Sequence, residues 1–209
     1  ENVFYYITLL NENYAMPGLQ AGTEEQIIKG MYLLSEPQPS AQGLQVNLLG
    51  CGSILRESIA AQKLLQEDWG VSANVWSCPS FNELAREGQD CERWNLLHPT
   101  ATPRVSFVAQ QLGKYVGAVV ASTDYMKAYA EQIRPFLPNG RRYKVLGTDG
   151  FGRSDFRYRL REHFEINRHY IAVAALKALQ EDGRLEAQTV AQAIAKYGIE
   201  ADKMNPLYA

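Results

Sequence analysis

The chain has 209 residues, of which 46% are hydrophobic and 21% are charged, and its formal net charge is -2. A chain of this length forms one large domain or two small ones, and it buries enough surface to fold without disulfides or a structural metal. The near balance of 21 basic and 23 acidic side chains excludes a strongly basic nucleic-acid-binding protein and an acidic tail protein. No apolar run approaches the roughly 18 residues of a membrane span, so we expect neither a nucleic acid nor a membrane as partner.

The cysteines indicate a reducing compartment. Cys51, Cys78 and Cys91 are an odd number and contain no CxxC pair, which argues against a disulfide framework and against a zinc ribbon. The first residues lack the basic and apolar regions of a signal peptide. We therefore expect a cytoplasmic protein, and the abrupt start at Glu1 suggests a segment of something longer.

The N-terminal part of the chain has three distinct stretches. Val3 to Leu10 is β-branched and aromatic, which predicts a strand. Thr23 and Gln26 have the spacing of a capping box and predict a short helix that runs to Tyr32. Ser35 to Gly43 is rich in proline and turn residues, so it predicts a linker and the best internal boundary.

From Leu44 onward, stretches typical of strands alternate with stretches that have helical apolar spacing. We expect strands at residues 44–49, 74–78, 115–121 and 143–147. We expect helices at residues 54–69, from about 80, and at 125–134, 155–163, 168–181 and 187–197. This alternation predicts an α/β fold, a three-layer α/β/α sandwich around a mainly parallel sheet.

Two consequences follow for burial and for ligand sites. The helices after Gly52 and Tyr125 should each bury an apolar face on the sheet, with Leu64 and Ala128 among the buried residues. In sheets of this class, ligands bind beyond the carboxyl ends of the strands. The loops of interest are therefore Gly50–Ser53, Pro79–Phe81, Ser122–Asp124 and Thr148–Asp155.

The turn Gly50–Ser53 resembles the start of a dinucleotide-binding fingerprint. Its third glycine would fall at position 55, which is Leu55, and the next strand ends in Ser77 and Cys78 instead of the acidic residue that binds a ribose. A tight turn that lets the helix pack on the sheet is the favoured interpretation. A free-standing nucleotide-binding protein remains an alternative.

Two other patterns give little support for a cofactor site or for catalysis. Thr148–Gly150 followed by Asn167 is superficially similar to the GDG…N signature of thiamine diphosphate enzymes, but the first glycine is missing and the asparagine comes too early. His98, His163 and His169 have neither the order of a catalytic triad nor HExxH spacing. We interpret these histidines as capping or surface residues.

The segment Asp90–Trp94 combines opposite charges, a thiol and an indole within five residues. Arg93 and Trp94 are residue types that anchor interfaces, which makes a subunit contact one interpretation. A solvated helix end is the other. Nothing nearby indicates that Cys91 is an activated thiolate.

The loop Asp149–Asp155 is the most unusual stretch, because it follows a strand and opens a helix on the ligand side of the sheet. Gly150 and Gly152 permit a sharp turn, and Ser154 or Asp155 is expected to cap the helix. Turn and capping chemistry explains the loop as well as ligand binding does.

Two side chains of this loop suggest roles other than forming the turn. We expect Phe151 to be packed and the loop to be ordered without a ligand. Arg153 suits the binding of a carboxylate or phosphate, and we expect it to pair with Asp149 or Asp155 or to reach a neighbouring domain or subunit.

Several runs of the sequence are similar to one family. They are Asn11–Tyr14, Ser80–Asn95, His98–Pro99, Thr102–Arg104, Ala121–Lys127, Leu146–Asp155 and Ala193–Pro206. These runs resemble the carboxyl-terminal region of the homodimeric, bacterial-type pyruvate dehydrogenases, a transketolase-like family. The resemblance covers essentially the whole chain.

The resemblance implies a transketolase C-terminal-domain-like fold with a five-stranded, mostly parallel mixed sheet. It implies that residues 1–40 are the exit strand of a preceding pyrimidine-binding domain plus a linker, and that residues 41–209 are the C-terminal domain. In such enzymes thiamine diphosphate and magnesium bind between the first two domains, across the dimer. Neither that cofactor motif nor the family's active-site histidines match here, so we expect no catalytic, cofactor-binding or metal-binding residue in this segment.

For the whole enzyme, the resemblance implies decarboxylation of pyruvate and reductive acetylation of lipoyl groups. Its implied partners are its own N-terminal and middle domains, a second subunit in a homodimer, and the dihydrolipoyl acetyltransferase core. We expect this segment to support the dimer and to shape the approach to the active site; an interaction module for regulators or complex partners is the alternative. The candidate residues for such an interface or approach are Asp149, Phe151, Arg153, Ser154, Asp155, Arg93 and Trp94.

Overall fold

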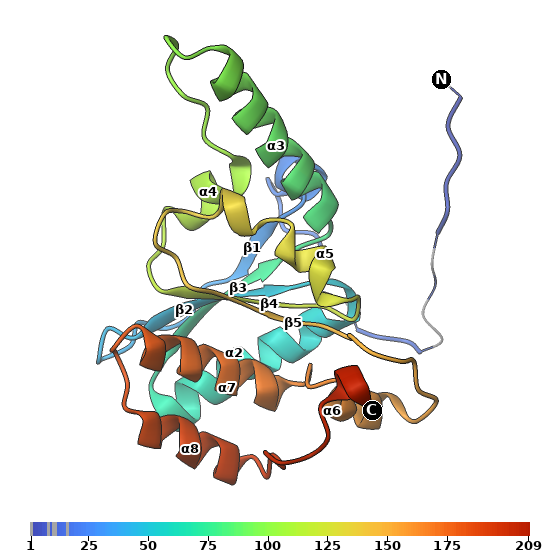
Figure 1. Ribbon diagram of the computed structural model, residues 1–209, viewed down its shortest axis with the longest axis vertical. Helices are drawn as coiled ribbons and strands as arrows, with labels where there is room; N and C mark the ends of the chain where they lie inside the picture. Colours follow the sequence, from blue (N-terminus) through green and yellow to red (C-terminus); the bar gives the residue numbers. More distant parts are fainter. Residues whose placement is uncertain (1, 8, 10–11, 16) are drawn as a thin grey trace.

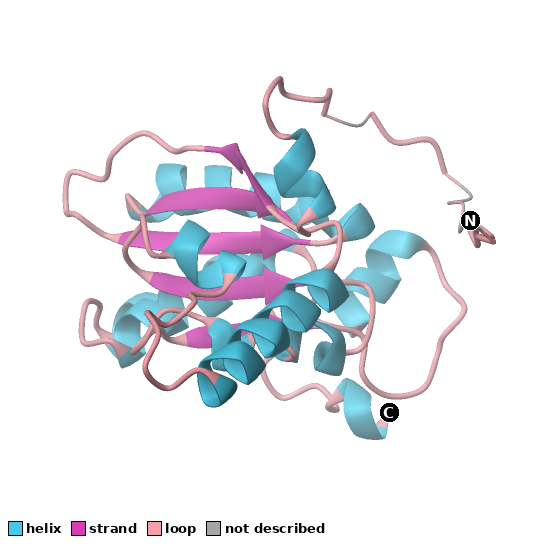
Figure 2. Ribbon diagram, turned by 90° about the horizontal axis from the view of Figure 1, so that it is seen from above, coloured by secondary structure: helices cyan, strands magenta, loops and turns pink. Residues whose placement is uncertain are grey.

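The computed structural model describes residues 2–7, 9, 12–15 and 17–209 (Figure 1). Its centre is a sheet of five strands, with the spatial order β1-β3-β2-β4-β5. The strands are β1 (Tyr32–Ser35), β2 (Gln45–Gly50), β3 (Ser72–Ser77), β4 (Ala118–Ser122) and β5 (Tyr143–Leu146). The edge strand β1 is antiparallel to β3, and the remaining pairs are parallel (Figure 2).

Helices cover both faces of the sheet (Figure 1). The helices are α1 (Glu24–Ile28), α2 (Leu55–Trp69), α3 (Phe81–Leu97), α4 (Phe107–Leu112), α5 (Lys127–Glu131), α6 (Arg157–His163), α7 (Arg168–Glu181) and α8 (Ala187–Lys196). One layer contains α3, α4 and α5, and the other contains α2, α7 and α8. The predicted three-layer α/β/α sandwich with a five-stranded mixed sheet is confirmed.

The core consists of two hydrophobic clusters, one on each face of the sheet. Strand β2 supplies both, because Leu48 belongs to the cluster under α2 and α7 and the adjacent Leu49 to the cluster under α3 and α5. Successive side chains of a strand point to opposite faces, so a central strand covered on both sides is apolar at nearly every position.

Local sequence signals fix several helix ends. Gly70 adopts φ 63° and ends α2, with the Val71 amide donating to the carbonyl of Leu65 at 3.0 Å, as expected of a glycine helix stop. The Ser80 hydroxyl accepts a hydrogen bond from the amide of Glu83 at 3.1 Å and caps α3. Both ends agree with the sequence prediction.

The N-terminal predictions were wrong in three respects. Within the described part, Val3 to Ile7 and Leu9 form no strand and are exposed, because no neighbouring strand is there to accept their backbone hydrogen bonds; residues 8 and 10 lie outside the described residues. The predicted helix to Tyr32 stops at Ile28, and residues 32–35 form β1 instead. Thr23 does not use its side chain as a cap, since its hydroxyl donates to the carbonyl of Gln20 at 2.6 Å.

Strand β1 also changes the extent of the sheet. It lies on the N-terminal side of the predicted boundary between residues 1–40 and 41–209, yet it pairs with β3. Strand β1 has only four residues, contains a bulge and lies next to a proline-rich stretch. Its sequence pattern is therefore too short to predict a strand. The assignment of residues 1–40 to the exit strand of a preceding domain plus a linker stays a prediction.

The helix faces that contact the sheet differ by one or two positions from the prediction. In α2 the fully buried side chain is Leu65, whereas Leu64 is half-buried. In α5 the buried residue is Ala130, whereas Ala128 is exposed. Helix α5 covers only Lys127–Glu131, so the apolar spacing over residues 125–134 does not correspond to one continuous helix. In the described part of the chain, none of the helices combines the length and the apolar character needed to cross a membrane.

Candidate functional site at the carboxyl edge of the sheet

The carboxyl ends of β2, β4 and β5 lie side by side. Gly50 is in register with Ser122, and Ser122 is in register with Leu146. The loops that follow these strands therefore meet at one edge, as the sequence predicted for ligand-facing loops. We call this the carboxyl edge; it comprises residues 51–54, 123–126 and 147–156.

Hydrogen bonds tie these loops together. The Ser53 hydroxyl donates to a carboxylate oxygen of Asp124 at 3.0 Å, and the Thr148 hydroxyl donates to the Asp124 carbonyl at 2.8 Å. Asp149 accepts the backbone amide of Lys127 at 3.0 Å, and its other carboxylate oxygen lies 3.8 Å from the Lys127 ammonium group. Asp149 therefore holds the start of α5, which is a structural role.

The loop 149–155 borders a cavity of about 600 Å³ that it shares with α6 and Glu12. Gly150 has φ +106°, and a Cβ atom there would lie 2.2 Å from the carbonyl oxygen of Pro206. The C-terminal turn Pro206–Tyr208 thus packs directly on this loop. Gly152, by contrast, faces open space.

Two expectations for the turn and capping residues of this loop were wrong. The side chain of Phe151 is 79% exposed, so it is not packed within the described structure. Neither Ser154 nor Asp155 caps α6, because the helix begins two residues later at Arg157; Asp155 instead accepts the amide of the adjacent Phe156 at 2.6 Å. A cap must stand immediately before the first helical turn, and the loop runs past both candidates.

Arg153 lies on the wall of the same cavity. Within the described residues it forms no ion pair with Asp149 or Asp155, so the expected local pairing is wrong. Asp149 is already bound to Lys127. The alternative that Arg153 reaches a neighbouring domain or subunit stays a prediction.

Sequence reasoning missed a cluster in which Glu12 and Tyr14 contact arginines of α2 and α6. Two guanidinium groups lie over the Tyr14 ring, that of Arg56 at 4.6 Å and that of Arg157 at 5.6 Å from the ring centroid. The Tyr14 hydroxyl donates to Glu12 at 2.6 Å and accepts from Arg161 at 3.4 Å. Glu12 in turn pairs with Arg157 at 3.2 Å. We call Glu12, Tyr14 and these three arginines the N-terminal clamp.

The ionisation of the clamp follows from these contacts. The hydrogen bond from Tyr14 and the charges of Arg157 and Arg161 lower the pKa of Glu12, although partial desolvation opposes them. Desolvation and the adjacent Glu12 raise the pKa of Tyr14. Glu12 therefore stays ionised and Tyr14 stays protonated at neutral pH, which preserves the hydrogen bond between them.

Behind the clamp lies a buried ion cluster centred on Glu57 of α2. One of its oxygens accepts from Arg161 and the other from the backbone amide and side chain of Arg168, at distances of 2.9 to 3.1 Å. Burial alone would raise the pKa of Glu57, but the hydrogen bonds from Arg168 and the charge of Arg161 outweigh it and lower that pKa. The cluster joins α2, α6 and α7 through a carboxylate that is itself buried, so we assign it a structural role.

The glycine turn after β2 serves packing. A Cβ atom at Gly50 would lie 2.7 Å from the Cα atom of Leu55, and Leu55 itself is buried. The start of α2 therefore approaches the sheet too closely to leave a diphosphate-sized space above the turn. Burial also raises the pKa of Cys51 to about 11, so its thiol is not activated.

Arg93 and Trp94 lie far from the loop 149–155, on the end of α3 that projects beyond the sandwich (Figure 1). Trp94 is half-buried between the ring of His98, at 4.5 Å, and the guanidinium group of Arg104, at 4.4 Å. Arg93 is exposed. The structure thus separates the predicted site residues into two places, and only five of them share the carboxyl edge region.

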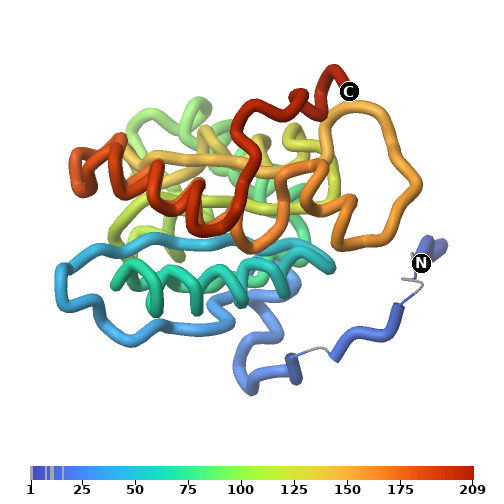
Figure 3. The backbone as a smooth tube through the Cα atoms, turned by 90° about the horizontal axis from the view of Figure 1, so that it is seen from below, coloured from blue at the N-terminus to red at the C-terminus, as the bar shows by residue number. Residues whose placement is uncertain are grey.

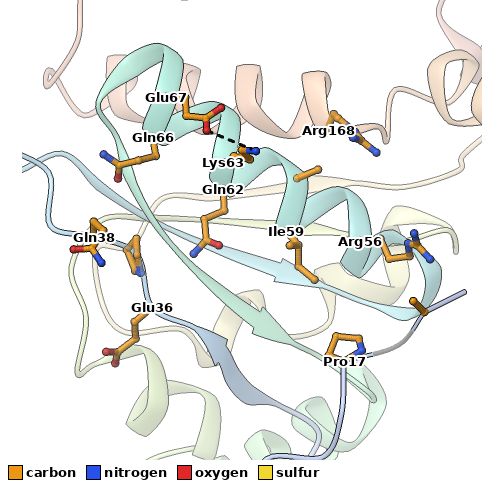
Figure 4. Close-up of a pocket in the computed structure, with 13 residues that line it drawn as sticks. Pro17, Glu36, Gln38, Arg56, Ile59, Gln62, Lys63, Gln66, Glu67 and Arg168 are labelled. Atoms are coloured by element: carbon orange, nitrogen blue, oxygen red, sulfur yellow. Dashed lines mark ion pairs between the residues drawn. The ribbon is translucent and has the colours of Figure 1, made fainter.

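A second hollow lies between the segment Glu36–Gln38 and α2, with a volume of about 790 Å³ (Figure 4). Gln62 and Lys63 of α2 line it, and Lys63 pairs with Glu67 at 3.7 Å. The charges that line it are mixed, with Arg56, Lys63 and Arg168 beside Glu36 and Glu67. Across the described residues, no group of three or more His, Cys, Asp or Glu side chains is placed to hold a metal ion.

Comparison with known proteins gives the family. Residues 30–167 match the transketolase-like TK C-terminal domain. The chain belongs to this family. In fold it is similar to the transketolase of Pichia stipitis crystallised with sedoheptulose 7-phosphate, with a TM-score of 0.50 over 80% of this chain and 20% of that one, at 18% identity.

Closer relatives align with nearly the whole chain. The chain is 55% identical over 99% of its length to the pyruvate dehydrogenase E1 component of Cupriavidus necator, and 54% identical over 100% of its length to that of Escherichia coli K12. It spans 23% of the length of each of these relatives. The resemblance inferred from the sequence runs is confirmed.

Proposed function

We propose that this chain is the C-terminal domain of a pyruvate dehydrogenase that decarboxylates pyruvate and reductively acetylates lipoyl groups on a dihydrolipoyl acetyltransferase core. The observation that carries the proposal is identity of 45 to 57% over nearly the whole chain to pyruvate dehydrogenase E1 components. The three unpaired cysteines support a cytoplasmic location.

We assign this domain a supporting role and not a catalytic one. Thiamine diphosphate and magnesium belong, in this proposal, to the rest of the polypeptide. The residues here do not fit them, because the carboxylate of Asp149 is bound to Lys127 and the side chain of Asn167 caps α7 by accepting amides of His169 and Tyr170. The loop 149–155 instead presents exposed Phe151 at the carboxyl edge, which suits contact with another part of a homodimer.

Cofactor binding tests the supporting role. Equilibrium dialysis of the 209-residue chain with thiamine diphosphate and magnesium should show no saturable binding, and the chain should not decarboxylate pyruvate. The longer polypeptide that contains this chain should do both. Saturable micromolar binding by the chain alone would contradict the proposal.

Arg153 tests the approach role of the loop. Arg153→Ala should change the unfolding free energy of the chain by less than about 0.5 kcal/mol, since no buried partner is lost. In the longer polypeptide it should lower turnover or dimerisation more than Arg159→Ala, which removes the same charge from the exposed side of α6. If Arg153→Ala melts the chain but leaves turnover and dimerisation intact, the role assigned to the loop is wrong.

The projecting end of α3 favours a second role as an interaction module. Leu96 and Leu97 are exposed there beside Arg93 and Trp94. Exposed apolar residues around a half-buried tryptophan are typical of an interface anchor. Titration of the longer polypeptide with lipoyl and acetyltransferase domains should show binding that Leu96→Ser weakens if this second role holds.

A further inference from the structure

Exposed aromatic and aliphatic side chains gather around the carboxyl edge. They come from the start of α5, from the loop before α6 and its first turn, and from the C-terminal turn. They are Tyr125, Met126, Phe151, Phe156, Tyr158, Leu207 and Tyr208, and together we call them the aromatic edge.

The segments that carry the aromatic edge are in direct contact. The amide of Thr148 donates to the carbonyl of Tyr125 at 2.9 Å, which joins the first segment to the second. Gly150 packs against Pro206 and so joins the second to the third. Phe156 and Tyr158 stack with ring centroids 6.1 Å apart. A cluster of this kind on a folded surface is a typical interaction site, whereas single exposed apolar residues are ordinary.

The N-terminal segment leaves the domain beside this edge. The clamp fixes Glu12 and Tyr14 on α6, where Glu12 lines the same cavity as Arg153, and the chain before them extends away from the sandwich instead of returning over it (Figure 1, Figure 3). Its own large side chains are exposed as well. They are Val3, Phe4, Tyr5, Tyr6, Ile7 and Leu9.

We infer that the aromatic edge is covered by the part of the same polypeptide that precedes residue 12, with Glu12 and Tyr14 as the anchor that holds the two parts in register. This inference rests on the proposed function, because it requires the longer polypeptide. The clamp fixes the point on the domain surface from which the preceding part extends. In each relative, the part outside the matching region is more than three times as long as this chain. A connection that starts a few residues from an exposed apolar surface gives the preceding part a high effective concentration over it.

The charges of the clamp explain why the anchor holds. A phenol ring in contact with two guanidinium groups gains cation–π attraction, and the carboxylate of Glu12 offsets the repulsion between Arg157 and Arg161. The anchor residues thus complement the positive charges of α2 and α6 that they contact.

Hydrogen–deuterium exchange tests the inference directly. In the longer polypeptide, amides of residues 2–9 and 150–158 should exchange at least about tenfold more slowly than in the 209-residue chain. Amides around the exposed Val116, at the opposite edge of the sheet, should exchange at the same rate in both proteins. Equal exchange in the two proteins would overturn the inference. Slowed exchange in the 209-residue chain on raising its concentration, without a further change in the longer polypeptide, would also overturn it in favour of a second copy.

Two variants of the longer polypeptide test the anchor and the surface separately. Tyr14→Ala and Phe156→Ser should each restore fast exchange to residues 2–9, whereas Val116→Ser, at another exposed apolar position, should not. Pyruvate decarboxylation by the unmodified longer polypeptide is measured in parallel. Its absence refutes the proposed function, while activity without protection of the aromatic edge refutes only this inference.

Discussion

Replacing Glu57 by glutamine should destabilise the domain more than any other single loss of charge in α2. Glu57 is 4% exposed and accepts four hydrogen bonds from two arginines. The variant keeps the size of the side chain but removes the charge and one acceptor oxygen. It leaves the guanidinium group of Arg161, which is 14% exposed, without its carboxylate.

The size of the effect follows from the burial of the partners. Breaking a buried ion pair by removing one partner costs about 3 to 5 kcal/mol, because the remaining charge stays buried. Arg168 is 47% exposed and can turn its charge to water, so its part is small. We therefore expect about 3 kcal/mol, dominated by Arg161.

Urea unfolding at neutral pH measures this difference. The matched control is Glu67→Gln on the same helix, where an exposed carboxylate pairs with Lys63 at 3.7 Å and the expected cost is below about 0.5 kcal/mol. Equal stabilities of the two variants would refute the reasoning that Glu57 is held as an ion in a buried cluster.

The same variant has a pH signature. The folded state lowers the pKa of Glu57 below its ordinary 4.5, so its contribution is complete above about pH 4.5 and is lost as the pH falls toward the folded value. The gap between the parent chain and Glu57→Gln should therefore shrink below about pH 4.5. A gap that stays constant down to acid pH would show that the carboxylate charge is not the cause.

Other substitutions test the packing of the carboxyl edge and of α2. Gly150→Ala should destabilise the loop by about 1 to 3 kcal/mol, because of its positive φ and its contact with Pro206, whereas Gly152→Ala should be neutral in thermal unfolding. If both glycine variants are neutral, the loop does not pack on the C-terminal turn as described. Leu65→Asp should unfold the domain, since an unpaired charge in the core costs several kcal/mol, whereas Leu64→Asp should leave a folded protein by circular dichroism. Equal loss of structure in both would contradict the orientation of α2.

Periodic patterns predicted the sandwich because its central elements are regular. Strand β4 is apolar on both faces up to its last residue, α2 ends at a glycine with positive φ, and Ser80 caps α3, so local preference and tertiary packing agree there. The predictions failed where an element is short or depends on a distant partner. Strand β1 exists through its pairing with β3, and α5 has too few turns for its apolar spacing to indicate the buried face.

The loop 149–155 shows how far sequence reasoning extends at a site. Its position beyond β5 follows from the order of elements and was predicted correctly. Its internal contacts were not, because Asp149 is bound by Lys127 from another loop and Gly150 approaches Pro206 near the end of the chain. Spacing within the loop carries no information about either neighbour.

The N-terminal clamp is the clearest case of information that only the fold supplies. Glu12 and Tyr14 stand in a turn-rich run that the sequence comparison marked as similar to the family but to which no chemistry could be assigned. The arginine that binds the Tyr14 hydroxyl is 147 residues away along the chain, and it also binds the buried Glu57. Arg161 thus connects the exit of the N-terminal segment to the core of the domain, so loss of Glu57 should loosen the clamp as well as the core. Faster exchange of amides 12–15 in Glu57→Gln than in Glu67→Gln would show this coupling, and equal exchange would show that the clamp and the core act independently.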